Sequence, residues 1–402
     1  MLISSIVQQN EYQLRLISFF IKPPIFVEIS TNKKGITNLK YTLTSTPPNK
    51  EITSFLLKRP KLIILTGYMI FLFLNGIYAT RSSHVDFNVK VSATIFSILL
   101  PVSVFIIIIL WFWDPRNLVD LLNMFLEYEK NHYFSEKRWK IWRISLKYFI
   151  WIFGFGFSLL APISLASLNV LETDRLPFLG SLIPREESME LRMVFAHGVI
   201  IVFQTWQYYL AFPSYVLITT NIFIASILSL LLYLGEISRK ICNPSSNKLI
   251  HVTQQLNELR QLKILEAQVN ATFRKLFLPG TFFLFCFGNV VSNFLCISYH
   301  ATLFDNLGHL AFFGICLESW VGILCLGTLS GHVNKRSRLI LVKLRQQQCN
   351  VGDWKEEKIF RKGVGACAQM KIRVGSNFVG ILTPLVMMSF CLKLSVRLLL
   401  FH

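Results

Sequence analysis

The chain alternates long apolar runs with shorter polar stretches that are mostly basic. Each run is long enough for a helix to cross the ~30 Å hydrocarbon core of a bilayer. The runs occupy residues 62–79, 91–113, 148–171, 194–234, 276–304, 306–334 and 374–392, and Glu318 is the one Asp, Glu, Lys or Arg inside them. We therefore predict an all-α fold, a polytopic bundle of seven transmembrane helices. Composition agrees, because 53% of the residues are hydrophobic and only 16% are charged.

Basic side chains are distributed unequally among the segments that connect these runs. Segments 1–61, 114–143, 235–275 and 335–373 together hold 33 Lys and Arg, whereas 80–90, 172–192 and residue 305 together hold 5. Cytoplasmic loops of membrane proteins are enriched in Lys and Arg, so the asymmetry predicts a cytosolic N-terminus and a C-terminus on the other side of the membrane. We expect a multi-pass protein of the plasma membrane, with its C-terminus extracellular. The first thirty residues lack the layout of a cleaved signal peptide. The formal net charge of +19 then suits the anionic inner leaflet rather than nucleic acid.

The fourth run, 194–234, is long enough for two crossings. A second crossing would place the 7 and 11 cations of the two later basic segments outside, so a single crossing is favoured. A helix of 41 residues extends about 62 Å, roughly twice the hydrocarbon thickness. Half of this apolar helix must therefore project into the cytosol and pack against other protein.

A helical domain beneath the membrane is also indicated by residues 250–276. Apolar side chains recur there at spacings of three and four, with charged residues between them, as in an amphipathic helix. The stripe consists of Leu256, Leu259, Leu262, Leu265, Val269, Phe273 and Leu276. Such a helix lies either on the inner membrane surface or against the projecting fourth helix or a neighbouring subunit. Residues 339–344 predict a further short helix there.

These patterns divide the chain into six segments. We predict a cytosolic segment 1–61, helices one to four in 62–234, an amphipathic linker of the cytosolic anchor domain in 235–275, helices five and six in 276–334, a basic linker in 335–373, and a seventh helix in 374–402.

At this point the sequence resembles the insect gustatory receptor family. The resemblance lies in the architecture, in the linker LNELRQLKILEAQVNATFRKLF and in VGSNF, which precedes the last helix. It implies a chemosensory, ligand-gated, nonselective cation channel that detects a small-molecule tastant or odorant. It also implies a tetramer, homomeric or heteromeric, whose last helices surround the pore and whose subunits meet in the cytosolic domain.

The last helix departs from the family pattern of Thr-Tyr, five hydrophobic residues and Gln-Phe. Setting Arg397 at the Gln position places Phe390 and Cys391 at Thr and Tyr, so no motif residue carries over. The resemblance therefore implies a divergent member, either an odorant-receptor-like relative or a gustatory-receptor-like protein. The candidate pore-lining residues are Met387, Phe390, Cys391, Ser395 and Arg397. Lys393 and Arg397 lie beyond the charge-free run, and either reach the outer headgroups or line the outer pore mouth, where they would oppose cation entry.

Polar groups in the outer halves of the membrane helices are the candidate ligand contacts. On helix four, His197, Gln204 and Tyr208 share one face, and Glu318 on helix six lies at the depth of Gln204. The full candidate list is His197, Gln204, Gln207, Tyr208, Trp206, Ser164, Ser167, Phe312, Phe313, Glu318 and Trp320. For Glu318 a structural hydrogen bond, a ligand contact and a pore role all stay open, because the membrane only requires that this group face protein or water. Aromatic walls with a few polar groups describe a small-molecule pocket, but also any helix bundle rich in Phe.

Enzymatic functions find little support. The eight cysteines are scattered, the eight histidines lack zinc-ligand spacing, and neither a glycine-rich phosphate loop nor a strand pattern is apparent. We therefore expect no enzyme, no cofactor and no bound metal. Two other functions stay open: a G-protein-coupled receptor, whose N-terminus must lie outside, and a transporter with its site at Glu318 and His197.

Overall fold

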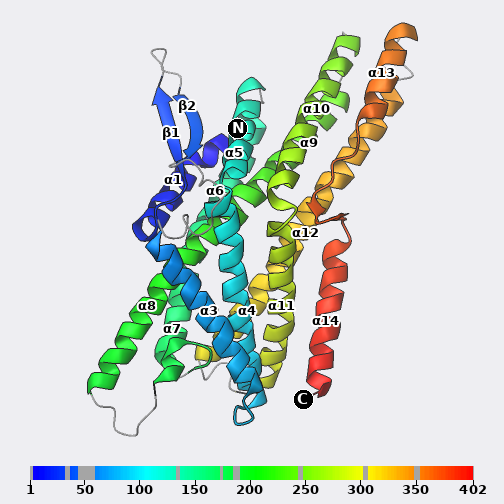
Figure 1. The fold of residues 1–402 in the computed structure, drawn as a ribbon. Helices are drawn as coiled ribbons and strands as arrows, with labels where there is room; N and C mark the ends of the chain where they lie inside the picture. The colour runs from blue at the N-terminus through cyan, green and yellow to red at the C-terminus, as the bar shows by residue number, and fades with distance from the viewer. Residues whose placement is uncertain are drawn as a thin grey trace.

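The computed structural model describes residues 3–31, 37–43, 59–132, 136–172, 175–183, 191–242, 248–301, 307–347 and 354–401. It is mostly helical, and seven helical runs in these ranges are long and apolar enough to cross a membrane, which confirms the predicted bundle. The runs are Pro60–Arg81, Phe87–Trp113, Lys140–Leu171, Met193–Cys242, Phe277–Ser298, His309–Gln346 and Thr383–Leu400. Figure 1 shows them extending along one long axis.

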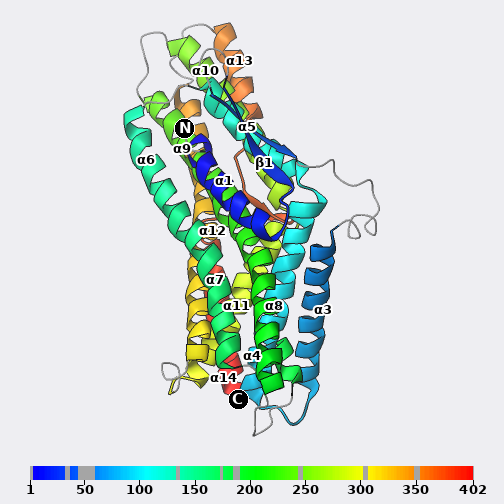
Figure 2. The same cartoon turned by 90° about the vertical axis from the view of Figure 1, so that its left-hand side faces the viewer.

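The two ends of the bundle differ (Figures 1 and 2). The loop end, at the bottom of both views, carries the connections 82–86 and 175–183 and the C-terminus. The extended end carries α1 (Ile3–Phe20), α5 (Arg116–Asn131), α9 (Ala225–Cys242), α10 (Lys248–Phe273) and α13 (Trp354–Ala366). The remaining helices are α3 (Pro60–Arg81), α4 (Phe87–Ile107), α6 (Glu136–Phe149), α7 (Phe157–Leu171), α8 (Leu191–Val216), α11 (Phe277–Ser298), α12 (Leu307–Gln347) and α14 (Thr383–Phe401).

The fourth helical run is continuous, as a single crossing requires. It passes from α8 through the π-helix η4 (Leu217–Ile224) into α9 without interruption. In its most apolar stretch 78% of the positions are buried, against 22% for α14. The extra length is therefore covered by other helices of the same chain, because α9 packs against both α10 and α12.

Helix α10 matches the predicted amphipathic stripe. The stripe residues within the helix are buried, namely Leu256, Leu259, Leu262, Leu265, Val269 and Phe273. The helix packs against α9 and α5. Lys240 on α9 pairs with the buried Glu258 on α10, with 2.7 Å between Nζ and Oε1. Of the two packing alternatives, the structure has the helix against the projecting fourth helix. The short helix expected at 339–344 is the end of α12, which runs on to Gln347.

Three π-helical segments interrupt the spanning helices where α1 docks. They are η1 (Ile108–Trp113), η2 (Ile150–Gly156) and η4, and α1 packs against η2 and η4. Trp111 of η1 lines a cavity of about 10 Å³ together with Asn10 of α1 and Ile222 of η4. π-helical turns are rare and are frequently found at functional sites. Here they surround the helix that joins the extended end to the bundle.

Two short antiparallel hairpins accompany the helices, although no strand pattern is apparent in the sequence. β1 (Ile25–Thr31) pairs with β2 (Thr37–Leu43), with Val27 opposite Tyr41. The signal was an apolar alternation of period two at Ile25, Val27 and Ile29, which a search for long apolar runs does not detect. A second hairpin joins β3 (Arg373–Val374) to β4 (Asn377–Phe378).

The last helix begins later than expected. The sequence places its start at residue 374, whereas α14 begins at Thr383. The intervening residues form the β3–β4 hairpin, whose turn contains Gly375 at φ 58°. This left-handed conformation favours glycine and cannot continue a helix. Lys393 and Arg397, which follow the charge-free run, lie in the second half of α14.

Candidate ligand site and last helix

Buried polar side chains gather on the α8 surface that faces the bundle. Gln204, Gln207 and Tyr208 are 1%, 0% and 1% exposed. Among the described residues neither amide atom of Gln207 has a hydrogen-bond partner, and the same holds for Gln204 Nε2 and His197 Nδ1. Leaving a buried amide unpaired costs about 1–3 kcal/mol. Such groups in one region are typical of a site that awaits a ligand or water.

A chain of hydroxyl and amide groups links this surface to two further helices. The Tyr68 hydroxyl on α3 lies 3.3 Å from that of Tyr208, and the Asn169 amide on α7 donates to the Tyr208 oxygen at 3.2 Å. Asn169 Oδ1 is buried without a partner in the described part of the chain. Three helices therefore converge on Tyr208, and the network still holds unused acceptors and donors.

Residues 175–183 cover the loop end of the bundle. The side chain of Arg175 is 7% exposed and bonds to Glu172 at 2.6 Å. It also donates to Ser92 on α4 at 2.9 Å and lies over the Phe312 ring at 5.0 Å. Burial lowers the pKa of Arg175, and the neighbouring Glu172 carboxylate opposes that shift. The arginine thus ties the connection to α4 and α12.

Two further contacts hold the same connection. Phe178 is 1% exposed and packs on Phe96 with ring centroids 5.2 Å apart. The Asn75 amide on α3 donates to the Pro177 carbonyl at 2.8 Å. Together with Arg175, these contacts seat the connection between α3, α4 and α12 as a cover over this end of the bundle.

Glu318 lies on α12 in an unusual environment. Its side chain is on the exposed face of the helix, beside Leu317 and Val321, which are 57% and 39% exposed. It is close enough to Tyr215 on α8 for a coulombic interaction. Tyr215 in turn bonds to Thr281 on α11 at 3.3 Å. No hydrogen bond or ion pair reaches Glu318 from the residues that the structure describes.

The other candidates from the sequence are dispersed. Ser164 and Ser167 lie on the exposed face of α7 and bond to carbonyls of their own helix. Trp206 is partly buried beside Phe203. Phe312 lies under the guanidinium of Arg175, and Phe313 is 50% exposed. Trp320 packs with Met388 and Cys391, toward α14.

Sequence reasoning missed Tyr68, Asn169 and Arg175. A helical-phase argument could have found Asn169, because Ser158, Leu165 and Asn169 recur at spacings of seven and four and are all buried. Ser164 and Ser167, the candidates from the sequence, lie on the exposed face of α7 instead. No comparable signal marks Arg175, since its burial depends on the fold of a connection.

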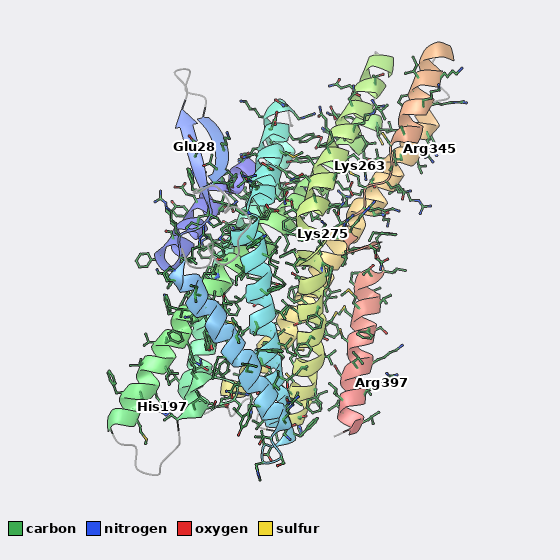
Figure 3. All side chains as sticks on the ribbon, viewed as in Figure 1. Glu28, His197, Lys263, Lys275, Arg345 and Arg397 are labelled. Carbon is green, nitrogen blue, oxygen red and sulfur yellow. The ribbon has the colours of Figure 1, made fainter. Side chains whose placement is uncertain are left out.

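Helix α14 has one face against α11 and α12 and one face uncovered. Ser395 donates to the Val290 carbonyl at 3.2 Å, and Cys391 Sγ lies 3.8 Å from the Cys286 carbonyl, so both face α11. Met387 is partly buried. Phe390 and Arg397 lie on the exposed face, with Lys393. Figure 3 places Arg397 at the same end of the molecule as His197 but on the other side of the view.

A polar clamp connects α10 to the entry of α14. Asn270 accepts from the Arg373 backbone at 2.8 Å and donates to the Lys371 carbonyl at 2.9 Å. Glu266 Oε1 accepts from the Lys371 backbone at 3.2 Å, and Lys263 donates to the Gln369 carbonyl at 3.0 Å. These side chains hold residues 369–373, directly before the hairpin that precedes α14. Within the described ranges, no three His, Cys, Asp or Glu gather in a way that could hold a metal ion.

No protein-family model matches the sequence, and no curated protein sequence matches it either. By structure the chain is similar to the insect olfactory receptor OR5 from Machilis hrabei, with a TM-score of 0.62 and 12% sequence identity. It is also similar to the structure of that receptor in complex with eugenol, with a TM-score of 0.58 and 10% identity. Both comparisons cover 98% of this chain and 98% of the receptor chain. Over its whole length the chain therefore has the fold of an insect olfactory receptor.

Proposed function

We propose that the chain is a chemosensory receptor of the gustatory type that acts as a ligand-gated, nonselective cation channel. The observation that carries the proposal is the set of unpaired buried polar atoms around Gln207, in a fold shared with a receptor that is solved in complex with eugenol. The gustatory type and the channel activity follow from the resemblance of the linker and of VGSNF to the insect gustatory receptor family. A small molecule that satisfies these atoms stabilises one of two states of the bundle and thereby shifts their equilibrium.

In this proposal the loop end faces the outside of the cell. The basic segments then lie on the cytosolic side, and the Arg175 cover lies over the ligand site. α1, α5, α9, α10 and α13 form the cytosolic anchor domain. The topology rests on the charge asymmetry, 33 cations against 5.

Four copies would place α14 around a central pore. Only 22% of the positions in its span are buried in the single chain, so its free face needs either lipid or other subunits. Phe390, Lys393 and Arg397 are on that face. Cys391 and Ser395 face α11, so they would hold α14 against α11 and would not contact ions. Two cations per subunit at the outer mouth would lower cation conductance, so neutralising Lys393 should raise it.

The test is patch clamp on cells that display an epitope added at the C-terminus, with a compound panel that includes eugenol. We expect ligand-evoked cation current, and tag detection without permeabilisation. Surface expression without any evoked current would contradict the channel, and tag detection only after permeabilisation would reverse the topology.

Substitution of Gln207 separates a ligand contact from a packing role. Gln207→Leu removes an unpaired buried amide, so we expect the empty protein to become more stable and the response to weaken about ten-fold. Ser164→Ala on the exposed face of α7 is the matched control and should change neither quantity. A stabilised protein with an unchanged response would remove Gln207 from the site.

A further inference from the structure

The third spanning run is longer than a membrane requires. It covers Lys140–Leu171, 32 residues, and extends about 48 Å against a hydrocarbon core of about 30 Å. Counted back from Leu171 at the loop end, about 20 residues fill the hydrocarbon, so the boundary lies near residue 152. The remaining residues of the run, 140–151, belong to α6 and the start of η2. They therefore lie beyond the hydrocarbon, at the extended end.

Contacts of Gln13 give the same boundary on a second helix. The fourth run begins at Met193, and about 20 residues take it across the hydrocarbon to roughly residue 212. The Gln13 side-chain nitrogen lies 3.4 Å from the Gly154 carbonyl oxygen and 3.3 Å from that of Pro213. Gly154 and Pro213 are therefore at one depth, and both helices leave the hydrocarbon there. α6 lies directly beyond that level.

Three cations of α6 form one stripe in this position. Lys140, Arg143 and Lys147 recur at spacings of three and four, which places them on one side of the helix. Lys140 and Arg143 are exposed, and Lys147 is partly buried. None of the three forms an ion pair with a residue that the structure describes. Since residues 140–171 also contain no Asp or Glu, the stripe is uncompensated positive charge just outside the hydrocarbon.

Exposed aromatic side chains accompany these cations. Trp142, Tyr148 and Trp151 are 51%, 65% and 64% exposed. Trp and Tyr are enriched where membrane proteins pass through the headgroup region. α6 packs against α1 and η2, and Figure 2 shows it along one edge of the molecule. Cations next to exposed aromatic rings at this depth are suited to a lipid headgroup, whereas a face that contacts only water does not require the rings.

We propose that α6 binds the headgroup of an anionic phospholipid with several phosphate groups, a phosphoinositide, in the inner leaflet. Seven residues separate Lys140 from Lys147, so Lys140 lies about 10 Å further from the hydrocarbon. A serine headgroup keeps its charges close to the surface and meets Lys147 first. An inositol ring with further phosphates extends outward, so it can form charge-assisted hydrogen bonds with all three cations.

This inference rests on the proposed orientation, which places the extended end in the cytosol. Anionic lipids are concentrated in the cytoplasmic leaflet, where basic residues next to a spanning helix attract them. The acyl chains of the bound lipid would lie along the apolar surface of η2 and α7. Ile152 and Leu160 are exposed there, at 53% and 63%.

The experiment measures thermal stabilisation of the purified full-length protein in detergent as a function of lipid concentration. The lipids are short-chain phosphatidylinositol bisphosphate, phosphatidylserine and phosphatidylcholine with identical acyl chains. Inositol trisphosphate supplies the phosphates without the lipid. We expect the affinity to fall in the order bisphosphate, serine, choline. The free headgroup should bind about ten-fold more weakly than its lipid, because it lacks the apolar chains.

The variant Lys140→Gln, Arg143→Gln and Lys147→Gln removes the stripe. It should weaken binding of the bisphosphate lipid at least about ten-fold, since each cation near an anionic surface contributes about five-fold in affinity. The exchange Lys140→Arg, Arg143→Lys and Lys147→Arg keeps the charge and should retain the binding. It separates loss of charge from a general effect of three substitutions on folding.

The matched control removes three cations from the part of α12 that reaches the extended end. Its substitutions are Lys335→Gln, Arg338→Gln and Arg345→Gln, all at exposed positions, and it should bind the lipid as the wild type does. Three results would overturn the inference: equal affinity for the three lipids, equal affinity for the free headgroup and its lipid, or equal effects of the two triple substitutions.

The outcome is independent of the channel proposal, because binding in detergent requires neither current nor a defined orientation. Phosphoinositide binding through α6 by a protein that passes no current would support this inference and sink only the channel. Ligand-evoked current in a protein that no phosphoinositide stabilises would sink only this inference.

Discussion

The Asn221 amide on η4 donates to the Gln13 Oε1 atom on α1 at 2.7 Å, across 208 positions of sequence. Gln13 in turn donates to Ser158 on α7 at 2.8 Å. The same Asn221 amide donates to Asn10 at 3.0 Å, and Asn10 donates to the Tyr41 hydroxyl on β2 at 2.9 Å. This buried network fastens the N-terminal helix and hairpin to two spanning helices.

Replacing Gln13 with alanine should lower the free energy of unfolding by about 2–3 kcal/mol, because Asn221 and Ser158 both lose a buried partner. Thermal unfolding in detergent measures the change. Gln8→Ala, at an exposed position of the same helix, is the control and should be nearly neutral. Equal effects of the two substitutions would show that the network contributes no stability.

Glu129 caps the beginning of α1. It accepts from the Ile3 and Ser4 backbone amides at 2.9 and 3.1 Å and from the Tyr233 hydroxyl at 2.7 Å, and it is 1% exposed. Glu129→Gln keeps the shape but replaces one acceptor with a donor and removes the charge that favours a helix N-terminus. We expect a loss of about 1–3 kcal/mol in the unfolding free energy. Glu127→Gln, an exposed neighbour, should change it by less than about 0.5 kcal/mol.

Arg175→Ala should loosen the cover at the loop end. The expected loss is about 2–3 kcal/mol, below that of a fully buried pair, because Glu172 stays 25% exposed. Hydrogen exchange of residues 175–183 should rise locally, and ligands should dissociate faster. Arg81→Ala, exposed at the same end, is the control. Unchanged exchange in Arg175→Ala would mean that Phe178 and Asn75 hold the connection without the arginine.

Asn270→Ala should uncouple α10 from the entry of α14. The substitution leaves the Arg373 amide and the Lys371 carbonyl without their side-chain partner. We expect a small loss of overall stability, about 1 kcal/mol, and a much larger loss of ligand-evoked current with binding preserved. Asn257→Ala, on the exposed face of α10, should leave both unchanged. A parallel loss of binding and current would indicate misfolding instead of uncoupling.

Gly331→Ala should displace the start of α14. A Cβ atom at this position would lie 2.8 Å from the Gly380 backbone, which cannot yield as a flexible side chain can. We expect a destabilisation of about 1–3 kcal/mol by overpacking. Gly314→Ala on the same helix meets nothing within 4 Å and should be slightly stabilising. Thermal unfolding of both variants decides the comparison.

The seven helices could be predicted from long charge-free runs, the continuous fourth run from the distribution of Lys and Arg, and the buried face of α10 from its local periodicity. The candidate site could be predicted only in part. Gln204, Gln207 and Tyr208 were found because they are polar within an apolar run, whereas Tyr68 and Arg175 required knowledge of which helices meet. The start of α14 was misplaced because an apolar composition continues through residues 374–382, and a single left-handed glycine changes the structure there.

The π-helical turns have a consequence for comparing this chain with its relatives. Each such turn accommodates a residue more than the same turn of α-helix, so deleting one residue from η4 would restore plain α-helix and remove the widened turn against which α1 packs. Natural variation at 108–113, 150–156 and 217–224 should therefore be constrained in length more than in side-chain identity. In an alignment of relatives, single-residue gaps at these three places would show which of them share the contact between the spanning helices and α1.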